Sequence, residues 1–148
     1  MRLSAKGRYA LAATASMAQN KNYNEYITLI SISEKLGISK IYLEQVFSLL
    51  KHGGIVNSIK GSQGGYQLSR APHEITAYDI LSAVETSLFE GTEETVKDKS
   101  PDIEAAMSQT IFIPLDDLIK SSLQKITLYD LVSEAEKHNS DQGLMFFI

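Results

Sequence analysis

The stretch that decides the fold is SKIYLEQVFSLLKH, residues 39–52. At about 100° per residue, its polar and apolar side chains fall on two separate arcs of a helical wheel, with Tyr42 on the apolar arc. Ile41 is the exception, because it lies among the polar side chains. An apolar group placed there suits a helix in a DNA major groove, where it can meet a thymine methyl group. The alternative is an ordinary surface helix with one buried stripe.

The preceding residues complete a helix-turn-helix motif. A short helix is predicted over about 29–36, Gly37 ends it, and Ser39 is the expected N-cap of the next helix. Two helices joined by a tight, glycine-containing turn form the motif whose second helix enters the groove. Further upstream, residues 5–19 are predicted to form a first helix capped by Ser4.

The basic and alanine-rich start of the chain has a second interpretation, as a signal or transit peptide. The alanine-rich segment lacks the strongly apolar stretch that such a peptide needs, and no run approaches the length of a membrane span. We therefore expect a soluble, cytoplasmic protein.

A hairpin is predicted directly after the helix-turn-helix. Residues 55–60 and 66–70 have the pattern of strands, and GSQGG at 61–65 supplies glycines where positive φ is needed. A hairpin in this place is a wing. A phosphate-binding loop is the alternative, but the Gly-Lys-Ser/Thr ending of such loops is missing.

The second half begins with a fourth helix, expected over 77–88 with Thr76 as its cap and Tyr78, Ile80, Leu81 and Val84 turned inward. A polar, acidic loop follows over 89–99. Ser100 and Pro101 then begin a long amphipathic helix, since proline is favoured at the first helical position. Its apolar residues recur at steps of three and four, at Ile103, Met107, Ile111, Leu115, Leu118, Ile119, Leu123 and Ile126.

Two features of this long helix stay open. Pro114 either kinks it or divides it into two helices. Its apolar stripe is expected to pair with the same helix of a second chain, although packing against its own domain is the alternative. A short helix over 127–137 and a flexible link over 139–143 complete the chain before LMFFI at 144–148.

Charge divides the chain into two unlike parts. Residues 1–80 carry nine Lys and Arg against five Asp and Glu, whereas residues 81–148 carry five against thirteen. A basic first part suits phosphate groups. The chain has no cysteine, which excludes disulfides and thiolate-held metal clusters. The three histidines lie far apart in the sequence and are interpreted as surface residues.

Five segments resemble one family of bacterial winged helix-turn-helix regulators, that of IscR, NsrR and CymR. They are MRLSAKGRYAL (1–11), GISKIYLEQVFSLL (37–50), KGSQGGYQL (60–68), EITAYDILSAVE (74–85) and ITLYDL (126–131). The resemblance covers nearly the whole chain, in order, and it implies a homodimer that binds a palindromic operator.

The resemblance also implies roles for individual residues. The expected DNA-binding residues are Arg2, Ser4, Lys6, Arg8, Tyr9, Ser39, Lys40, Ile41, Tyr42, Glu44, Gln45, Ser48, Lys60, Ser62, Gln63, Gly64 and Gly65. Tyr42 is expected to reach at most a phosphate, since the wheel places it on the buried arc. The expected dimerisation residues are Ile103, Met107, Ile111, Leu115, Leu118, Ile119 and Leu123.

The departures from the family point to one branch of it. Cluster-binding members carry three cysteines in the loop after the fourth helix, and this chain has none there, so no iron–sulfur cluster or other cofactor is expected. The cysteine-metabolism repressor CymR resembles the chain in this respect and in its apolar, aromatic tail. That resemblance implies a protein co-regulator, O-acetylserine thiol-lyase (cysteine synthase), held by Met145, Phe146, Phe147 and Ile148. The alternative is that this tail packs into the dimer.

The sequence thus predicts a mainly α protein, with a winged helix-turn-helix domain over 1–88 and a loop, dimerisation helix and tail over 89–148. The predicted function is a dimeric DNA-binding repressor of cysteine or sulfur metabolism genes. The alternative is an interaction module that regulates the thiol-lyase and has little DNA affinity. An enzyme is the weakest interpretation, because no nucleophile, base and acid can be assembled.

Overall fold

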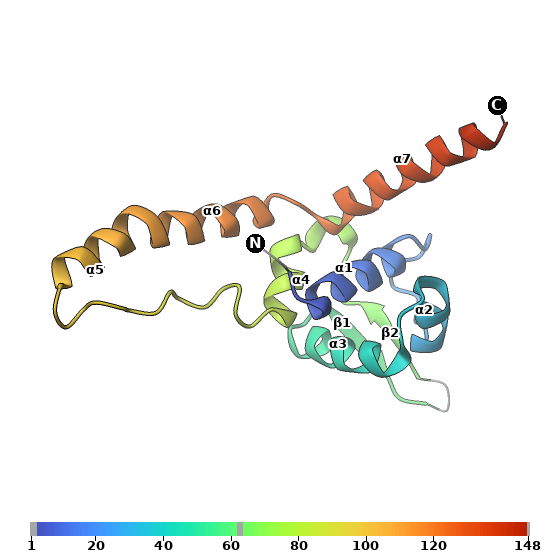
Figure 1. Ribbon diagram of the computed structural model, residues 1–148. Helices are drawn as coiled ribbons and strands as arrows, with labels where there is room; N and C mark the ends of the chain where they lie inside the picture. Colours follow the sequence, from blue (N-terminus) through green and yellow to red (C-terminus); the bar gives the residue numbers. More distant parts are fainter. Residues whose placement is uncertain (1–2, 62–63, 148) are drawn as a thin grey trace.

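Helices dominate the computed structural model, which describes residues 3–61 and 64–147, the last seven by their backbone alone. A head holds the first four helices and the sheet, and an arm and a last helix leave it in different directions (Figure 1). In order, the elements are α1 (Ala5–Ala18), α2 (Leu29–Leu36), α3 (Lys40–His52), β1 (Val56–Ile59), β2 (Gly65–Leu68), a 3₁₀ turn (Pro72–Glu74), α4 (Ala77–Val84), α5 (Pro101–Met107), a π-helical turn (Ser108–Phe112), α6 (Ile113–Gln124) and α7 (Leu128–Phe147). The predicted winged helix-turn-helix class is confirmed.

The first helix lies at the centre of the head. α1 contacts α2, α3, α4, α7 and β2. Small residues make this possible, because its buried face carries Gly7, Ala10, Ala13 and Thr14 before the larger Met17. The predicted cap is confirmed: the Ser4 hydroxyl accepts a hydrogen bond from the Gly7 N–H at 3.2 Å.

The helix-turn-helix forms as predicted. Gly37 ends α2 in the left-handed region at φ 69°, which glycine adopts without steric cost. Ser39 caps α3 by accepting from the Tyr42 N–H. The wing strands are antiparallel, and β2 also pairs with the segment before α2, through two backbone bonds between Ile27 and Tyr66 of 2.8 and 2.9 Å. This pairing fixes the wing beside the start of α2.

α4 joins the head to the arm, and a capping box fixes its start. Thr76 accepts from the Asp79 N–H, and the Asp79 carboxylate accepts from the Thr76 N–H at 2.9 Å. The same carboxylate oxygen accepts from Arg70, which follows the wing. The predicted end at residue 88 was wrong, because α4 stops at Val84 and the backbone of Glu85 is extended.

The start of α7 repeats the start of α4. ITAYD at 75–79 and ITLYD at 126–130 form the same capping box, with Thr127 and Asp130 in the second copy. The two segments pair antiparallel through 2.8 Å bonds from Ala77 N to Ile126 O and from Leu128 N to Ile75 O. The junction between arm and last helix is thereby attached to the first turn of α4.

The arm is one long helix with a wider turn in its middle. Within the π-helical turn the Ile113 N–H donates to the Ser108 carbonyl, five residues back. In a regular α-helix, the ring of Pro114 would clash with the carbonyl of Thr110. The wider turn accommodates the proline, so the helix is neither broken nor divided into separate helices at Pro114.

The last helix is longer than predicted. α7 runs on through 139–143, which was expected to be a flexible link, and reaches Phe147. Polar residues in this stretch cost a helix only fractions of 1 kcal/mol each and Gly143 about 1 kcal/mol, and an established helix propagates easily. Ile148 lies outside the described residues. None of the described helices is both long and apolar enough to cross a membrane.

We predict that Thr127→Ala lowers the free energy of unfolding by about 1 kcal/mol, because it removes the side-chain cap of α7. Urea unfolding at fixed protein concentration measures the loss. The matched control is Ser100→Ala at the start of α5, where the serine makes no capping hydrogen bond. The control should stay within about 0.5 kcal/mol of the starting protein. Equal losses in the two variants would contradict the assignment.

Candidate nucleic-acid interface

α3 exposes the polar arc that its sequence predicts. Its buried face is Leu43, Val46, Phe47 and Leu50. The exposed positions are Lys40, Ile41, Tyr42, Glu44, Gln45, Ser48, Lys51 and His52. Ile41 is 71% exposed, so an apolar side chain does lie among the hydrogen-bonding ones.

The placement of Tyr42 on the buried arc was wrong. The residue is 46% exposed, and its ring lies edge-on to that of Tyr9, with 5.4 Å between the centroids. A long side chain near the border between the polar and apolar arcs can turn toward either one. Here the side chain of Tyr42 packs on α1 instead of entering the core. This contact also places the start of α1 beside the start of α3.

The charged groups of α3 are only weakly held. Lys40 and Glu44 form an ion pair of 3.8 Å with both side chains about half exposed. Exposed pairs of this kind contribute roughly 0.3–0.5 kcal/mol, so either group can exchange its partner for a ligand. The Ser39 hydroxyl accepts the capping bond, which leaves its proton for donation.

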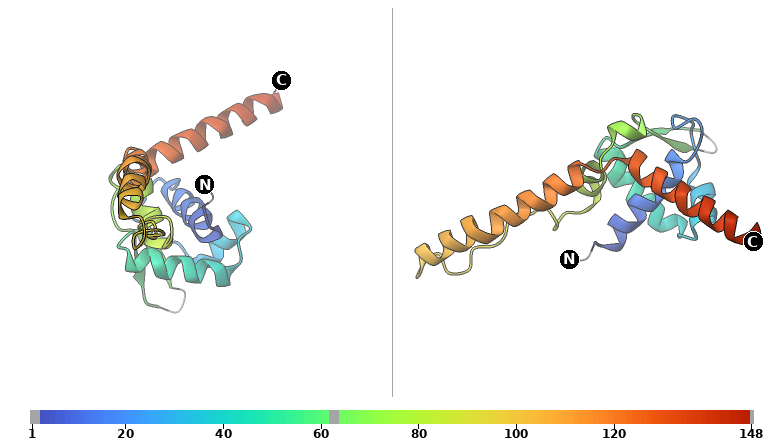
Figure 2. Two further views of the ribbon diagram at one scale, coloured as in Figure 1. Left: turned by 60° about the vertical axis from the view of Figure 1, so that its left-hand side comes forward. Right: turned by 90° about the horizontal axis from the view of Figure 1, so that it is seen from above.

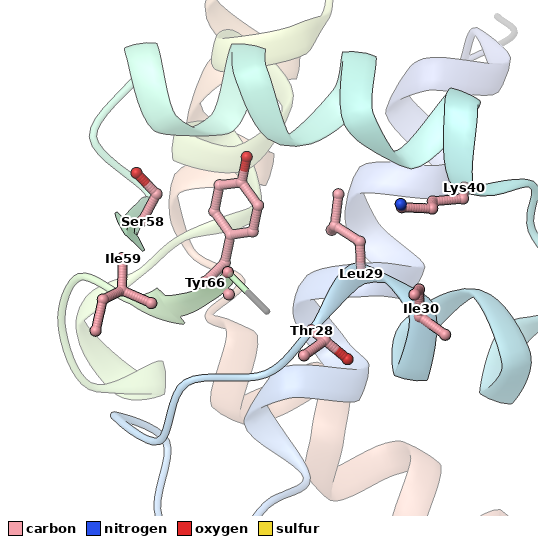
Figure 3. Close-up of a pocket in the computed structure, with 9 residues that line it drawn as sticks. Thr28, Leu29, Ile30, Lys40, Ser58, Ile59 and Tyr66 are labelled. Carbon is pink, nitrogen blue, oxygen red and sulfur yellow. The ribbon is translucent and has the colours of Figure 1, made fainter. Parts of the chain in front are cut away.

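A groove separates α3 from the wing. It has a volume of about 630 Å³, and Figure 3 shows Lys40, Ser58 and Tyr66 around it together with the start of α2. Its lining is Thr28, Leu29, Ile30, Lys40, Ser58, Ile59, Gly64, Gly65 and Tyr66. Ile30 and Ile59 are both exposed apolar residues. An ammonium group, hydroxyls and a helix N-terminus beside apolar side chains suit an anionic chain with apolar parts, such as a sugar–phosphate strand.

The wing tip is described in part. Lys60 is exposed, and Gly64 has φ 62°, which favours glycine at this position. The predicted tip residues Ser62 and Gln63 lie outside the described residues. In both Figure 1 and the left view of Figure 2, the wing extends on the same side of the head as α3.

The start of α1 carries exposed cations. Lys6 and Arg8 are both exposed, while Arg2 lies outside the described residues. The Ser4 hydroxyl is already bonded within the protein, because it caps α1 and donates to Glu85 at 2.7 Å. The sequence contained no signal for this contact, since the two residues are 81 positions apart.

The arm leaves most of its apolar stripe uncovered. Ile103, Ile111, Leu115 and Leu118 are exposed, and Leu118 reaches 68%. Met107, Ile119 and Leu123 are partly buried. A hollow of about 270 Å³ lies where the arm meets the head, with an almost wholly apolar lining of Leu3, Leu81, Leu88, Leu118, Ile119, Ser122 and Leu123. Figure 1 shows the rest of the arm pointing away from the head.

The loop over 86–100 is organised by a carboxylate. Glu104 of α5 is 7% exposed, and its Oε1 accepts from the backbone N–H groups of Thr95 and, at 2.8 Å, Val96. Nothing in the sequence marked Glu104 among the other acidic residues. Within the described parts of the chain, no three His, Asp or Glu side chains are grouped so that they could hold a metal ion.

Comparisons with known proteins agree with this architecture. A family model described as Rrf2, iron-dependent transcriptional regulator, matches residues 3–134. The regulator IscR of Escherichia coli (strain K12 / DH10B) is 36% identical over 92% of this chain and 83% of its own length. The regulator IscR of Pectobacterium carotovorum is 37% identical over 92% and 82%.

Solved structures give the same result. CymR (YrzC), the global cysteine regulator of B. subtilis, superposes with a TM-score of 0.71 at 34% identity, over 90% of this chain and 98% of that one. IscR of T. potens superposes with a TM-score of 0.69 at 31% identity, over 93% and 90%. The head, the wing, the long arm and these similarities together establish that the chain belongs to the Rrf2 family of transcriptional regulators.

Proposed function

We propose that this protein is a homodimeric repressor that binds a palindromic operator in the cytoplasm, with α3 in the major groove and the wing on the neighbouring backbone. The observation that carries the proposal is the exposed face of α3, where the side chains of Ile41, Glu44 and Gln45 are open to solvent. A helix with this mixture of exposed groups matches the donor, acceptor and methyl pattern of the major groove.

The three side chains have distinct chemistry toward base edges. The Glu44 carboxylate accepts from a cytosine amino group, and the Gln45 amide can bond an adenine with both its donor and its acceptor. Ile41 can pack against a thymine methyl group. Cations from two elements add sequence-independent contacts to phosphates, Lys40 at the groove and Lys6 and Arg8 on α1.

The uncovered stripe of the arm supports the dimer. Exposed Ile111, Leu115 and Leu118 would lie in water in a single chain, and burying apolar area contributes roughly 25 cal/mol per Å². A second copy placed by a two-fold axis covers the same residues on both chains. Two heads then meet two half-sites of a palindrome, one helical turn of about 34 Å apart or a multiple of it.

Base recognition is tested by two classes of variant. Glu44→Ala and Gln45→Ala should each reduce the preference for the operator over random DNA by roughly 1–3 kcal/mol per half-site, because each loses one base contact in each half-site. Lys6→Ala and Arg8→Ala should weaken operator and random DNA alike and flatten the salt dependence of binding. Fluorescence anisotropy over a salt series, with an operator from the protein's own upstream region, measures both effects. An equal loss on both DNAs for Glu44→Ala would overturn the assignment.

The family description mentions iron, and the residues of this chain do not fit an iron–sulfur cluster. The chain lacks cysteine, and the described loop over 86–100 is held by Glu104. We predict that protein purified without oxygen has no visible chromophore and no stoichiometric iron, and that it stays dimeric under oxidising and reducing conditions. A cluster-binding family member prepared in parallel is the control. Stoichiometric iron in this protein would contradict the prediction.

We further propose that the regulated genes serve cysteine or sulfur metabolism, and that O-acetylserine thiol-lyase is the co-regulator. Support comes from the similarity to the B. subtilis global cysteine regulator and from the apolar segment LMFFI at 144–148. The backbone of α7 carries residues 144–147 away from the side of the head where α3 and the wing lie (Figure 1). A partner held there leaves the DNA-binding face accessible.

Deleting Phe147 and Ile148 should abolish binding to the purified thiol-lyase while basal operator affinity stays unchanged. Titration calorimetry measures the first quantity and anisotropy the second, and light scattering reports the mass. The control is Lys137→Ala on the same helix, whose ammonium is paired only with the exposed Glu134 at 3.8 Å among the described contacts. Undiminished binding by the truncated chain would show that this segment is not the contact. Dissociation into monomers would place it in the dimer instead.

A further inference from the structure

A buried carboxylate lies against the first turn of α1. Glu85 is 7% exposed, and its Oε1 accepts from the backbone N–H of Ser4 at 2.8 Å and from the Ser4 hydroxyl at 2.7 Å. Backbone N–H groups and the helix dipole make the N-terminus of a helix electropositive, so a carboxylate there is stabilising. Glu85 thus connects the end of α4 to the start of α1.

The close approach requires a glycine inside α1. A Cβ atom built on Gly7 would lie 2.2 Å from Glu85 Oε1. Gly7 is not in a left-handed conformation, so space alone requires glycine here. Glycine is unfavourable within a helix, and the contact with Glu85 gives a physical reason for its presence.

The turn that Glu85 holds is the turn that carries exposed cations. Lys6 and Arg8 flank Gly7. Arg8 Nη1 donates to the Leu3 carbonyl at 2.6 Å, so the position of this guanidinium also depends on the path of the backbone at residue 3. Tyr9 follows and packs on Tyr42 of α3. The orientation of this turn therefore decides where both cations lie relative to the recognition helix.

We propose that Glu85 is a positioning residue for DNA binding: it holds the first turn of α1 so that Lys6 and Arg8 meet the phosphate backbone while α3 occupies the groove. The proposal rests on the proposed function, because it names how the phosphate contacts of that interface are arranged. It separates the phosphate contacts of α1, which depend on Glu85, from the base contacts of α3, which do not.

The test is a double-mutant cycle on DNA affinity. Glu85→Ala should weaken operator and random DNA by the same factor. It should also lower the magnitude of the salt slope, the change of log affinity with log salt concentration, by about 3.6, the value for two lost phosphate contacts in each protomer of the dimer. In that background Lys6→Ala and Arg8→Ala should have little further effect, whereas Glu44→Ala should retain its full effect. Glu104→Gln, at the other buried carboxylate, is the control and should leave the slope unchanged.

A loss of overall stability alone would not produce this pattern. The molecules that remain folded would make the same phosphate contacts, so the salt dependence of their binding would be unchanged. Thermal unfolding monitored by circular dichroism identifies any variant that fails to fold. If Glu85→Ala is such a variant, Glu85→Gln and Ser4→Ala replace it, and each should flatten the slope in part. A folded Glu85→Ala protein with an unaltered slope, or with additive losses from Lys6→Ala, would overturn the proposal.

Amide hydrogen exchange measured in the absence of DNA tests the role of Glu85 independently of the proposed function. Glu85→Ala should increase exchange at the amides of residues 4–8, and Gly7→Ala should do the same, because the new methyl group displaces the carboxylate. In the Glu85→Ala background, Gly7→Ala should instead slow exchange, since alanine favours a helix. Absence of DNA binding in the starting protein would refute the proposed function, whereas unchanged exchange in these variants would refute the role of Glu85.

Discussion

Two carboxylates hold the two ends of α4, and the geometry of the whole chain depends on them. Asp79 caps the start of α4 and accepts from Arg70, which follows the wing. Glu85, just after the end of α4, accepts from Ser4 at the start of α1. Hydrogen bonds to charged groups contribute about 1.5–3 kcal/mol each, more than ordinary surface contacts. The wing and the first turn of α1, two of the three candidate DNA-binding parts, are both attached to this short helix.

The arm is attached to the same helix. The paired ITAYD and ITLYD segments place the start of α7 against the start of α4, and the arm ends at Gln124, two residues before the pairing begins at Ile126. The loop over 86–100 lies between Glu85 at its beginning and Glu104 just beyond its end. Here backbone N–H groups of the loop bind a carboxylate, which requires neither a metal nor a thiolate.

Local patterns made most of the fold predictable. Serine and threonine caps, Gly37 and the apolar arc of residues 39–52 act within one or two turns of a helix, so their effects are visible in the sequence. Tyr42 was misplaced because a wheel cannot show that Tyr9 offers it a partner outside the core. The contacts of Glu85 and Glu104 join residues that are distant or set in irregular loops, and no local pattern indicates them. The length of α7 was underestimated because polar residues and one glycine only weaken a helix.

The candidate interface was predictable to a similar extent. The exposure of Ile41, Glu44 and Gln45 follows from helical periodicity alone. The use of the Ser4 hydroxyl within the protein does not, because it depends on a partner 81 residues away. The groove beside the wing also depends on tertiary structure, since the pairing of Ile27 with Tyr66 brings α2 next to the hairpin.

The wide turn in the arm also determines the direction in which its apolar residues point. Ile103, Met107, Ile111 and Leu115 are spaced by four, and in an uninterrupted α-helix each step of four rotates a side chain by about 40° around the axis. Three such steps would wind the apolar stripe through about 120°. In a π-helical turn the N–H bonds to the carbonyl five residues back, so each residue rotates the chain less around the helix axis. This turn therefore reverses part of that rotation between Met107 and Leu115. The apolar stripe of the arm therefore winds less around the helix axis than it would in an uninterrupted α-helix.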